Sequence, residues 1–333
     1  RRLAGARAGR GNMNAGLEGL RKVLDEHIVG HEEVKQALLL GLACREHIYL
    51  EGPPGSAKTR MAEVVARSSS LSFFFYQLHR DTRLAELLGD VVLERRPLAE
   101  GEGERIHQRI EPGGILTAEI CVLDDISRAP GEALNVLLRI LNERKFGADS
   151  IPLLSAIATS NPMRDEYYNE PLDPANLDRF ALQLRVPGLI QSGAKEEARA
   201  LVSRFAAGTV VEQPELRAVV SRQTFDDLYA ALRRVQVPSE VKEGLLEILQ
   251  VLVVEYGCNE TNSLLTDRSF LVKAVKLLQG RAALAGRERV ELADLDVLRW
   301  MTTFRVAEEV HEKVPELIAR VVGSAGARPA RDS

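Results

Sequence analysis

The chain has 333 residues, of which 45% are hydrophobic and 28% are charged, a balance typical of a globular protein with a sizeable core. Its net charge of −4 lacks the basic character of a nucleic-acid binder, so we expect no nucleic-acid partner. No apolar run reaches the ~18 residues that a membrane-spanning helix needs, so we also expect no membrane span.

The first segment of the chain is rich in arginine up to its first acidic residue, Glu18, and we interpret residues 1–15 as a flexible tail. The cysteines lie far apart and lack metal-ligand spacing, which predicts free thiols in a reducing compartment. We therefore expect a cytoplasmic protein. A plastid stroma is the alternative if the arginine-rich segment is the remnant of a transit peptide.

Residues 16–190 alternate short apolar runs with segments of helical periodicity. The helical segments cover residues 32–44, 58–66 and 130–144. The apolar runs, which predict strands, cover residues 47–50, 72–78, 120–123, 153–158 and 180–186. Five strands separated by helices indicate an α/β fold with a parallel sheet covered on both faces. The polar, glycine-containing stretch between Gly89 and Ile115 predicts an exposed hairpin insertion.

Residues from about 191 onward have helical periodicity throughout, which predicts a separate all-α domain over residues 191–310. The expected helices of this domain cover residues 194–205, 224–235, 240–255, 268–285 and 292–308. For residues 311–333 we expect a C-terminal helix and a disordered tail.

A phosphate-binding loop is predicted between the first strand and the helix that follows it. The turn reads Gly52, Pro53, Pro54, Gly55, Ser56, Ala57, Lys58 and Thr59, followed by Arg60. The glycines permit a tight backbone with inward amide N–H groups, Lys58 places a positive charge on the β- and γ-phosphates, and Thr59 offers a hydroxyl to Mg²⁺. The following helix adds its positive dipole end. We therefore expect a P-loop NTPase αβα core that binds ATP and Mg²⁺.

Ala57 departs from the usual form of this loop, in which a second glycine precedes the lysine. Alanine adds one methyl group and tolerates most right-handed backbone conformations. We therefore interpret the sequence as a variant of the loop that still binds nucleotide.

Two neighbouring carboxylates, Asp124 and Asp125, follow the third predicted strand. Mg²⁺ needs oxygen ligands, and hydrolysis needs a polarised water molecule. We expect Asp124 to hold Mg²⁺ through its water shell and Asp125 to orient or deprotonate the attacking water.

Two further polar residues lie at strand ends. Asn161 follows the fourth predicted strand and could position water near the γ-phosphate, with an ordinary Asn-Pro turn as the alternative. Arg179 precedes the last strand and can bind a phosphate in a bidentate manner, with a salt bridge at a helix end as the alternative.

The segments GPPGSAKT, VLDDISRAP, ATSNP and LDRF, in this order and spacing, resemble those of AAA+ ATPases of the MoxR group. The stretch TDRSFLVKAVKLLQGRAALAGRERVELADL is similar to the lid domain of that group, particularly in its RavA-like branch. The resemblance covers roughly residues 16–305. It implies that the αβα core is followed by a C-terminal all-α lid domain, which we assign to residues 191–310.

The resemblance also implies roles for matching positions. The positions that match Walker A, Walker B and sensor 1 are, in order, Lys58 and Thr59, Asp124 and Asp125, and Asn161. Arg179 matches the arginine finger, which acts on the ATP of a neighbouring subunit. Arg268, at the start of a lid helix, matches sensor 2, which would contact the γ-phosphate of its own subunit. Val29 lies in the segment that packs near the adenine, and the insertion after Gly89 projects toward the ring pore.

The function implied by the resemblance is that of a homo-oligomeric, hexameric ring. Its subunits would hydrolyse ATP at their interfaces to remodel, mature or assemble a protein partner, as a chaperone does. The implied partner contains a von Willebrand factor A domain. The alternatives are the ATPase subunit of a metal-chelatase-like complex and a nucleotide-binding regulatory module with slow turnover.

Asp125 is the feature that favours slow turnover, because the family usually has glutamate at this position. The side chain is one methylene shorter, so we expect its carboxylate to lie more than ~1 Å farther from the water, and a misplacement of that size can cost ~10²-fold in rate. Arg128, Glu143 and Arg144 follow the carboxylates in the sequence and are further candidates for contacts across a subunit boundary. A surface ion pair is the alternative for Arg128.

Overall fold

Five parallel strands form the centre of the molecule. The computed structural model describes residues 16–97, 104–162, 172–209, 215–265 and 268–326. The strands are β1 (His47–Glu51), β2 (Phe73–Gln77), β5 (Ile120–Asp124), β8 (Ser155–Ser160) and β9 (Phe180–Arg185). They pair in the order β2-β5-β8-β1-β9, and every pairing in this sheet is parallel. The predicted α/β fold and its five-stranded parallel sheet are confirmed.

The parallel arrangement gives the sheet two unlike edges. At the carboxyl edge, the chain leaves β1 after Glu51, β5 after Asp124 and β8 after Ser160. At the opposite, amino edge, the chain enters β1 at His47 and β9 at Phe180, which are paired with each other. A strand of five residues spans about 16 Å, so groups at the two edges of one subunit cannot touch the same small ligand atom.

Helices cover both faces of the sheet, and every residue of β5 and β8 is buried. A helix over residues 16–27, α2 (Glu32–Cys44) and α3 (Lys58–Arg67) contribute to the core on one face. On the other face, α5 (Gly131–Glu143) packs its leucine stripe against β5 and β8. Shorter elements complete this part of the chain: η1 (Gly114–Leu116), η2 (Ile126–Arg128), β6 (Lys145–Phe146), β7 (Asp149–Ser150) and α6 (Pro174–Leu177).

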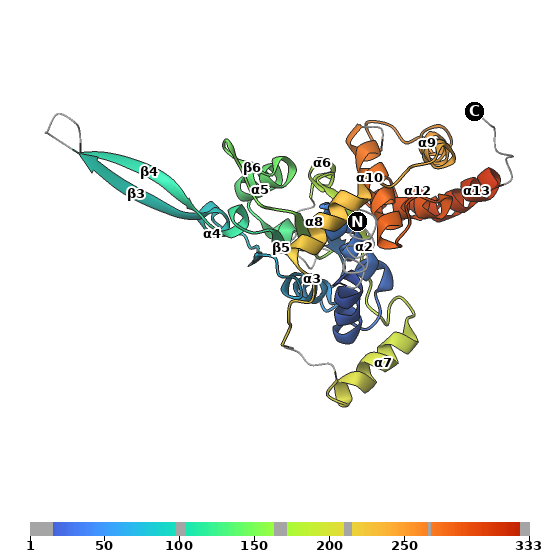
Figure 1. The fold of residues 1–333 in the computed structure, drawn as a ribbon, viewed down its shortest axis with the longest axis horizontal. Coiled ribbons are helices and arrows are strands. Elements are labelled where there is room, and N and C mark those ends of the chain that lie inside the picture. The colour runs from blue at the N-terminus through green and yellow to red at the C-terminus, as the bar shows by residue number, and fades with distance from the viewer. Residues whose placement is uncertain (1–15, 98–103, 163–171, 210–214, 266–267, 327–333) are drawn as a thin grey trace, which may run out of the picture.

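A long antiparallel hairpin projects from the body of the molecule (Figure 1). It follows the short helix α4 (Leu84–Leu88) and consists of β3 (Gly89–Pro97) and β4 (Glu104–Pro112). Its apolar side chains Val91 and Leu93 are exposed. The structure thus confirms the exposed hairpin predicted for this stretch.

The C-terminal half of the chain is helical. Its elements are α7 (Lys195–Ala206), α8 (Arg222–Leu232), α9 (Ser239–Val254), α10 (Arg268–Leu284), η3 (Leu292–Val297), α11 (Leu298–Thr302), α12 (Glu308–His311) and α13 (Val314–Gly326). The single helix expected over residues 292–308 is wrong, because a 3₁₀ segment and a break after Thr302 divide it. At the break, the Thr303 hydroxyl donates to the Gln183 carbonyl of β9 at 2.6 Å, which connects this turn to the outermost strand of the sheet.

The helical region and the αβα core share apolar packing. Side chains of α8, α9 and α10 join those of α2, β1 and β9 in one continuous hydrophobic cluster. Gly280 of α10 lies so close to α2 that an added Cβ would be 2.1 Å from the Cys44 sulfur. α10 therefore packs behind α2 and does not cover the phosphate loop. None of the helices in the described part of the chain has the length and apolar character needed to cross a membrane.

Candidate nucleotide site

The predicted phosphate loop connects β1 to α3 at the carboxyl edge of the sheet. The Gly52 amide donates to the Ser160 carbonyl at 3.2 Å, so the loop begins against the end of β8. A Cβ on Gly52 would lie 2.1 Å from the Val186 carbonyl oxygen, so only glycine fits there. Gly55 has a φ of +80°, which side-chain-bearing residues rarely adopt. These glycines therefore have the roles expected of them in shaping the loop.

Ala57 has the one loop conformation that the sequence did not predict. Its φ of 65° and ψ of 14° lie in the left-handed region, so the right-handed conformation expected for this residue is wrong. A left-handed conformation costs an L-residue other than glycine roughly 1–2 kcal/mol. This explains why glycine is usual before the lysine, and it shows that the loop shape is kept at the expense of some strain.

Lys58 is buried at the start of α3. Its Nζ donates to the carbonyls of Gly52 at 2.7 Å and Pro53 at 3.0 Å, and to Oδ1 of Asn161 at 3.2 Å. Burial lowers the pKa of Lys58 below its ordinary value, and the charges of Asp125 and Asp124 oppose that shift. The three donors of the ammonium thus all have neutral oxygen acceptors, and a phosphate at the mouth of the loop would replace some of them with charged oxygens.

The expected metal-binding residues lie together. The Thr59 hydroxyl donates to Oδ1 of Asp124 at 2.6 Å, and the Thr159 hydroxyl donates to the same oxygen. Hydroxyl and carboxylate oxygens are the donors that Mg²⁺ prefers, so these residues fit the ion. The described residues contain no cluster of three or more His, Cys, Asp or Glu side chains that could hold a metal ion.

Asp125 lies beside this pair in a left-handed conformation, with a φ of 53°. Its Oδ1 accepts from Nδ2 of Asn161 at 3.1 Å, and its amide donates to the Thr159 hydroxyl at 3.2 Å. Burial and the neighbouring Asp124 raise the pKa of Asp125, while Arg128 acts in the opposite direction. Thr159 was not singled out from the sequence, although its position two residues before Asn161, near the end of a strand, was the available signal.

Arg128 and Arg144 make contacts within their own subunit. Nη1 of Arg128 lies 3.6 Å from Oδ2 of Asp125, the local ion pair considered as the alternative for this residue. Arg144 donates to the carbonyls of Arg45 and Leu154. Arg144 thus braces the core, and the structure brings neither it nor Glu143, which pairs with Arg139, to the phosphate loop.

The segment around Val29 lies beside the first turn of α3. Burial and the positive charge of Arg60 lower the pKa of His27, so Arg60 is within electrostatic reach of this segment. Gly30 has a φ of +74° and packs against Leu189. The roles expected for Val29 and Arg60 in nucleotide binding stay predictions.

Arg179 lies at the opposite edge of the sheet, directly before Phe180, whose partner in β1 is the first residue of that strand. Arg268 is there too, because the hydroxyl of the next residue, Ser269, donates to Oδ2 of Asp178 at 3.3 Å. The structure thus does not bring Arg268 to the phosphate loop of its own subunit. The predicted contact between Arg268 and the γ-phosphate of its own subunit is therefore wrong, because α10 packs against α2 and begins at the amino edge.

The backbone on either side of Arg179 is held by the helical region. Arg305, a buried arginine that sequence reasoning missed, donates to Oδ1 of Asp178 at 3.2 Å and to the Phe180 carbonyl at 2.9 Å. Nζ of Lys273 on α10 donates to the Asp178 carbonyl at 2.5 Å. Lys273 and Arg305 lower the pKa of Asp178 against the effect of burial. Arg179 therefore lies between Asp178 and Phe180, which hydrogen bonds from Arg305 and Lys273 hold in place.

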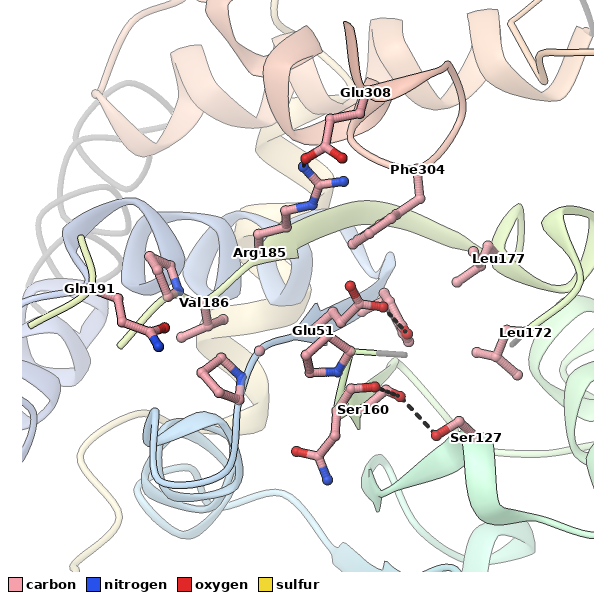
Figure 2. Close-up of a pocket in the computed structure, with 16 residues that line it drawn as sticks. Glu51, Ser127, Ser160, Leu172, Leu177, Arg185, Val186, Gln191, Phe304 and Glu308 are labelled. Carbon is pink, nitrogen blue, oxygen red and sulfur yellow. Dashed lines mark hydrogen bonds and ion pairs between the residues drawn. The ribbon is translucent and has the colours of Figure 1, made fainter. Parts of the chain in front are cut away.

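A cavity of about 580 Å³ borders the phosphate loop on the side of Gly52 and Asn161 (Figure 2). Glu51 projects into it and accepts from the Tyr49 hydroxyl at 3.2 Å, and burial raises the pKa of this carboxyl. The far wall comes from the helical region, through Phe304 and an ion pair between Arg185 and Glu308. The cavity thus has walls from both the phosphate loop and the C-terminal helices.

Comparison with known proteins gives a consistent picture. Residues 16–226 match the family described as the MoxR domain in the MoxR-vWA-beta-propeller ternary systems. The chain is 26% identical over 311 residues to Chaperone MoxR1 of Mycobacterium tuberculosis, and the alignment covers 87% of this chain and 76% of that protein. It is 27% identical over 287 residues to an uncharacterized protein of Methanocaldococcus jannaschii, and that alignment covers 85% of this chain and 70% of the other protein.

The fold is similar to that of a crystal structure from Cytophaga hutchinsonii ATCC 33406 described as a "putative ATPase". The TM-score is 0.74, and the match covers 97% of this chain and 98% of the other. At 19% sequence identity, the similarity concerns the fold alone.

Proposed function

We propose that this chain, which belongs to the MoxR family of AAA+ ATPases, binds ATP with Mg²⁺ at its phosphate loop and hydrolyses the ATP between the subunits of a ring. The observation that carries the proposal is one continuous set of hydrogen bonds at the carboxyl edge. Lys58 donates to Asn161, and Asn161 donates to Asp125. Thr59 donates to Asp124 directly beside them. Side chains from β5, β8 and α3 thus converge on the mouth of one loop.

Each residue of this set has a distinct task in the proposed reaction. The loop amides and Lys58 bind and orient the phosphates. Thr59 and Asp124 hold the Mg²⁺ ion, which, when bound, would neutralise charge on the phosphate oxygens. Asp125 orients or deprotonates the attacking water, and Asn161 holds Asp125 in place. Phosphoryl transfer depends mainly on such positioning and on electrostatic stabilisation.

The two arginines at the amino edge support the ring. Because Arg179 and Arg268 lie a strand length away from their own phosphate loop, we propose that both act on the nucleotide of the adjacent subunit. An arginine supplied in this way stabilises the charge that develops during phosphoryl transfer. We further propose a hexamer that remodels or assembles a protein partner. A partner with a von Willebrand factor A domain fits the description of the matching family.

The direct test measures ATP binding and phosphate release for the full chain and for Lys58→Ala. We expect this variant to lose detectable binding at micromolar ATP, because the loop loses its only side-chain cation. A matched control is Lys145→Ala, which removes an exposed lysine from β6. Retention of micromolar ATP affinity in Lys58→Ala would contradict the loop assignment.

A regulatory module with slow turnover is the second candidate, because Asp125 stands where the family usually has glutamate. Asp125→Glu is the discriminating variant. A rise of about 100-fold in phosphate release would support the slow module, since a misplacement of about 1 Å can cost that much. Unchanged or reduced turnover would support the motor. Turnover would fall in Asp125→Glu because the left-handed backbone at position 125 accommodates aspartate more readily than glutamate.

A further inference from the structure

Thr159 lies near the carboxyl end of β8, and its hydroxyl contacts both Asp124 and Asp125. The hydroxyl donates to Oδ1 of Asp124 and accepts from the Asp125 amide at 3.2 Å. Ala158 pairs with Leu123 in the sheet, so the residues that follow them, Thr159 and Asp124, lie side by side. A hydroxyl has one hydrogen to donate, and Thr159 gives it to Asp124. One side chain of β8 is thus bonded to both of the carboxylate-bearing residues at the end of β5.

The position of this hydroxyl is fixed by its surroundings. Thr159 is fully buried, so its hydroxyl cannot exchange these partners for bulk water. The branched Cβ of threonine also restricts the rotation of its side chain about χ1. The hydroxyl oxygen is therefore held at one place between β5 and β8.

The hydroxyl of Thr159 determines how the Asp124 carboxylate is presented. Oδ1 of Asp124 accepts from Thr159 on β8 and from Thr59 on α3, the second at 2.6 Å. Oδ2 accepts no hydrogen bond from any residue that the structure describes. The bonds at Oδ1 therefore orient the carboxylate and leave Oδ2 for the metal ion or its water shell. They also use the only hydroxyl hydrogen of Thr59, so the lone pairs of the Thr59 oxygen stay available to the same ion.

Thr159 also holds the backbone of Asp125. The φ of Asp125 is 53°, a left-handed conformation that residues other than glycine adopt infrequently. Its amide is bonded to the Thr159 hydroxyl, and its Oδ1 accepts from Nδ2 of Asn161 at 3.1 Å. Two residues at the end of β8 thus fix the main chain and the side chain of Asp125. Of these two residues, Thr159 is the one that is also bonded to Asp124.

We propose that Thr159 is a positioning residue of the nucleotide site, whose hydroxyl fixes the metal-binding carboxylate of Asp124 and the water-orienting residue Asp125 relative to each other. The inference rests on the proposed function, which assigns these two roles to the two aspartates. Loss of the hydroxyl should weaken the response of nucleotide binding to Mg²⁺. It should not weaken the binding of phosphates by the loop itself, because the hydrogen bonds of Lys58 do not involve Thr159.

The test compares variants of the full chain that keep or remove this hydroxyl. Thr159→Val removes it with little change in shape, and Thr159→Ser keeps it. Ser155→Ala is the matched control, because it removes another buried hydroxyl of β8, which donates to the Glu46 carbonyl at the amino edge. Calorimetry measures the Kd of a non-hydrolysable ATP analogue, once with Mg²⁺ and once with EDTA. Circular dichroism verifies that each variant is folded.

We expect Thr159→Val to raise the Kd measured with Mg²⁺ by about 10- to 100-fold, because groups that orient metal-binding side chains typically contribute this factor. The Kd measured with EDTA should stay within about twofold of that of the unmodified chain, since the loop is a separate set of contacts. A purely structural role would raise both values. Thr159→Ser and Ser155→Ala should stay within about threefold of the unmodified chain under both conditions.

A double-mutant cycle tests whether Thr159 acts through Asp124. Asp124→Asn should itself weaken binding in the presence of Mg²⁺, because it removes the charge that holds the ion. Adding Thr159→Val to Asp124→Asn should then change the Kd by about threefold or less, since two residues that act as one unit are not additive. If Thr159→Val raises the Kd by the same factor in both backgrounds, the proposed action through Asp124 is overturned.

The remaining outcomes separate this inference from the proposed function. If the unmodified chain does not bind the analogue, or binds it equally with Mg²⁺ and with EDTA, the proposed function fails. If the unmodified chain responds to Mg²⁺ and Thr159→Val responds equally, the proposed function stands and the role of Thr159 is overturned. Losses in Thr159→Ser or Ser155→Ala as large as in Thr159→Val would also overturn it. Thr159→Ala replaces Thr159→Val if the latter does not fold, and failure of both to fold would show a structural role instead.

Discussion

The two edges of the parallel sheet each carry a buried cation, but the two cations are held in opposite ways. At the carboxyl edge, burial lowers the pKa of Lys58, and its protein acceptors are two carbonyls and one amide oxygen. At the amino edge, Arg305 donates to Asp178 and to several backbone carbonyls. The comparison teaches that one edge holds its cation on neutral acceptors, which an anionic ligand could replace, whereas the other uses its cation to fix the backbone around Arg179.

The largest effect that would sharpen this comparison concerns Arg179 itself. We expect Arg179→Ala to lower kcat by about 10³-fold, the effect of losing an arginine finger, while the Kd for ATP stays within about twofold. The reason is that Arg179 lies a strand length from its own phosphate loop. Steady-state phosphate release and ATP titration measure the two quantities.

Complementation provides the control for Arg179. Lys58→Ala subunits bind no ATP but retain Arg179, so adding them to Arg179→Ala subunits should restore phosphate release. Arg128→Ala should have a smaller effect on kcat, because Arg128 pairs with Asp125 in its own subunit. If ATP binding is lost together with kcat in Arg179→Ala, the separation of the two edges is wrong.

The next effect concerns stability. We expect Arg305→Met to lower the free energy of unfolding by about 3 kcal/mol, because it removes one of the two cations that pair with Asp178 and leaves the carbonyls of Phe180, Ala181 and Met301 without this donor. Lys58→Met is the matched comparison at the other edge and should change stability by less than about 1 kcal/mol, since the hydrogen bonds that it removes are offset by the loss of a buried charge without an ion-pair partner closer than its neutral acceptors. Urea unfolding of both variants measures these changes. Equal losses would show that both cations are structural.

A pH effect should also come from the amino edge, through His47. Its ring accepts from the Ala156 amide at 2.9 Å and contacts the Leu141 carbonyl at 2.8 Å, and burial lowers its pKa to about 3. Protonation below the ordinary pKa of 6.5 then occurs only in the unfolded chain, so stability is complete above pH 6.5 and falls as the pH decreases toward 3.

From pH 7 to pH 5, this histidine should lower the free energy of unfolding by about 2 kcal/mol. Urea unfolding at both pH values checks the expectation. His47→Gln should show a correspondingly shallower dependence, because glutamine does not titrate. The same pH dependence in both proteins would exclude His47 as its source.

The smallest effect is expected in the phosphate loop. Ala57→Gly should raise the free energy of unfolding by about 0.5–1 kcal/mol, because glycine removes the left-handed strain but loses more backbone entropy on folding. Ala62→Gly, within α3, is the control and should lower stability by about 1 kcal/mol. Thermal unfolding of the two variants distinguishes the cases. A loss of stability in Ala57→Gly would mean that the loop does not need the left-handed conformation.

Much of the carboxyl edge could be predicted because its residues lie in short segments that end strands. Asp124 and Asp125 follow an apolar run, and Asn161 follows another. Parallel strands bring their carboxyl ends together, so the meeting of these groups with Lys58 follows once the strands are recognised. Thr159 was missed in spite of this, because a hydroxyl within a strand has no distinctive local pattern.

The sequence by itself determined the five-stranded sheet, the hairpin and the loop, since each is specified by periodicity or by residues that are neighbours in the chain. The tertiary structure alone decided the handedness of Ala57, the break after Thr302, the place of Arg268 and the role of Arg305. Arg268 lies at the amino edge because α10 packs against α2, more than 200 residues earlier in the chain. Apolar helix faces look alike in a sequence, so their pairing is decided only by how all of them fill one shared core.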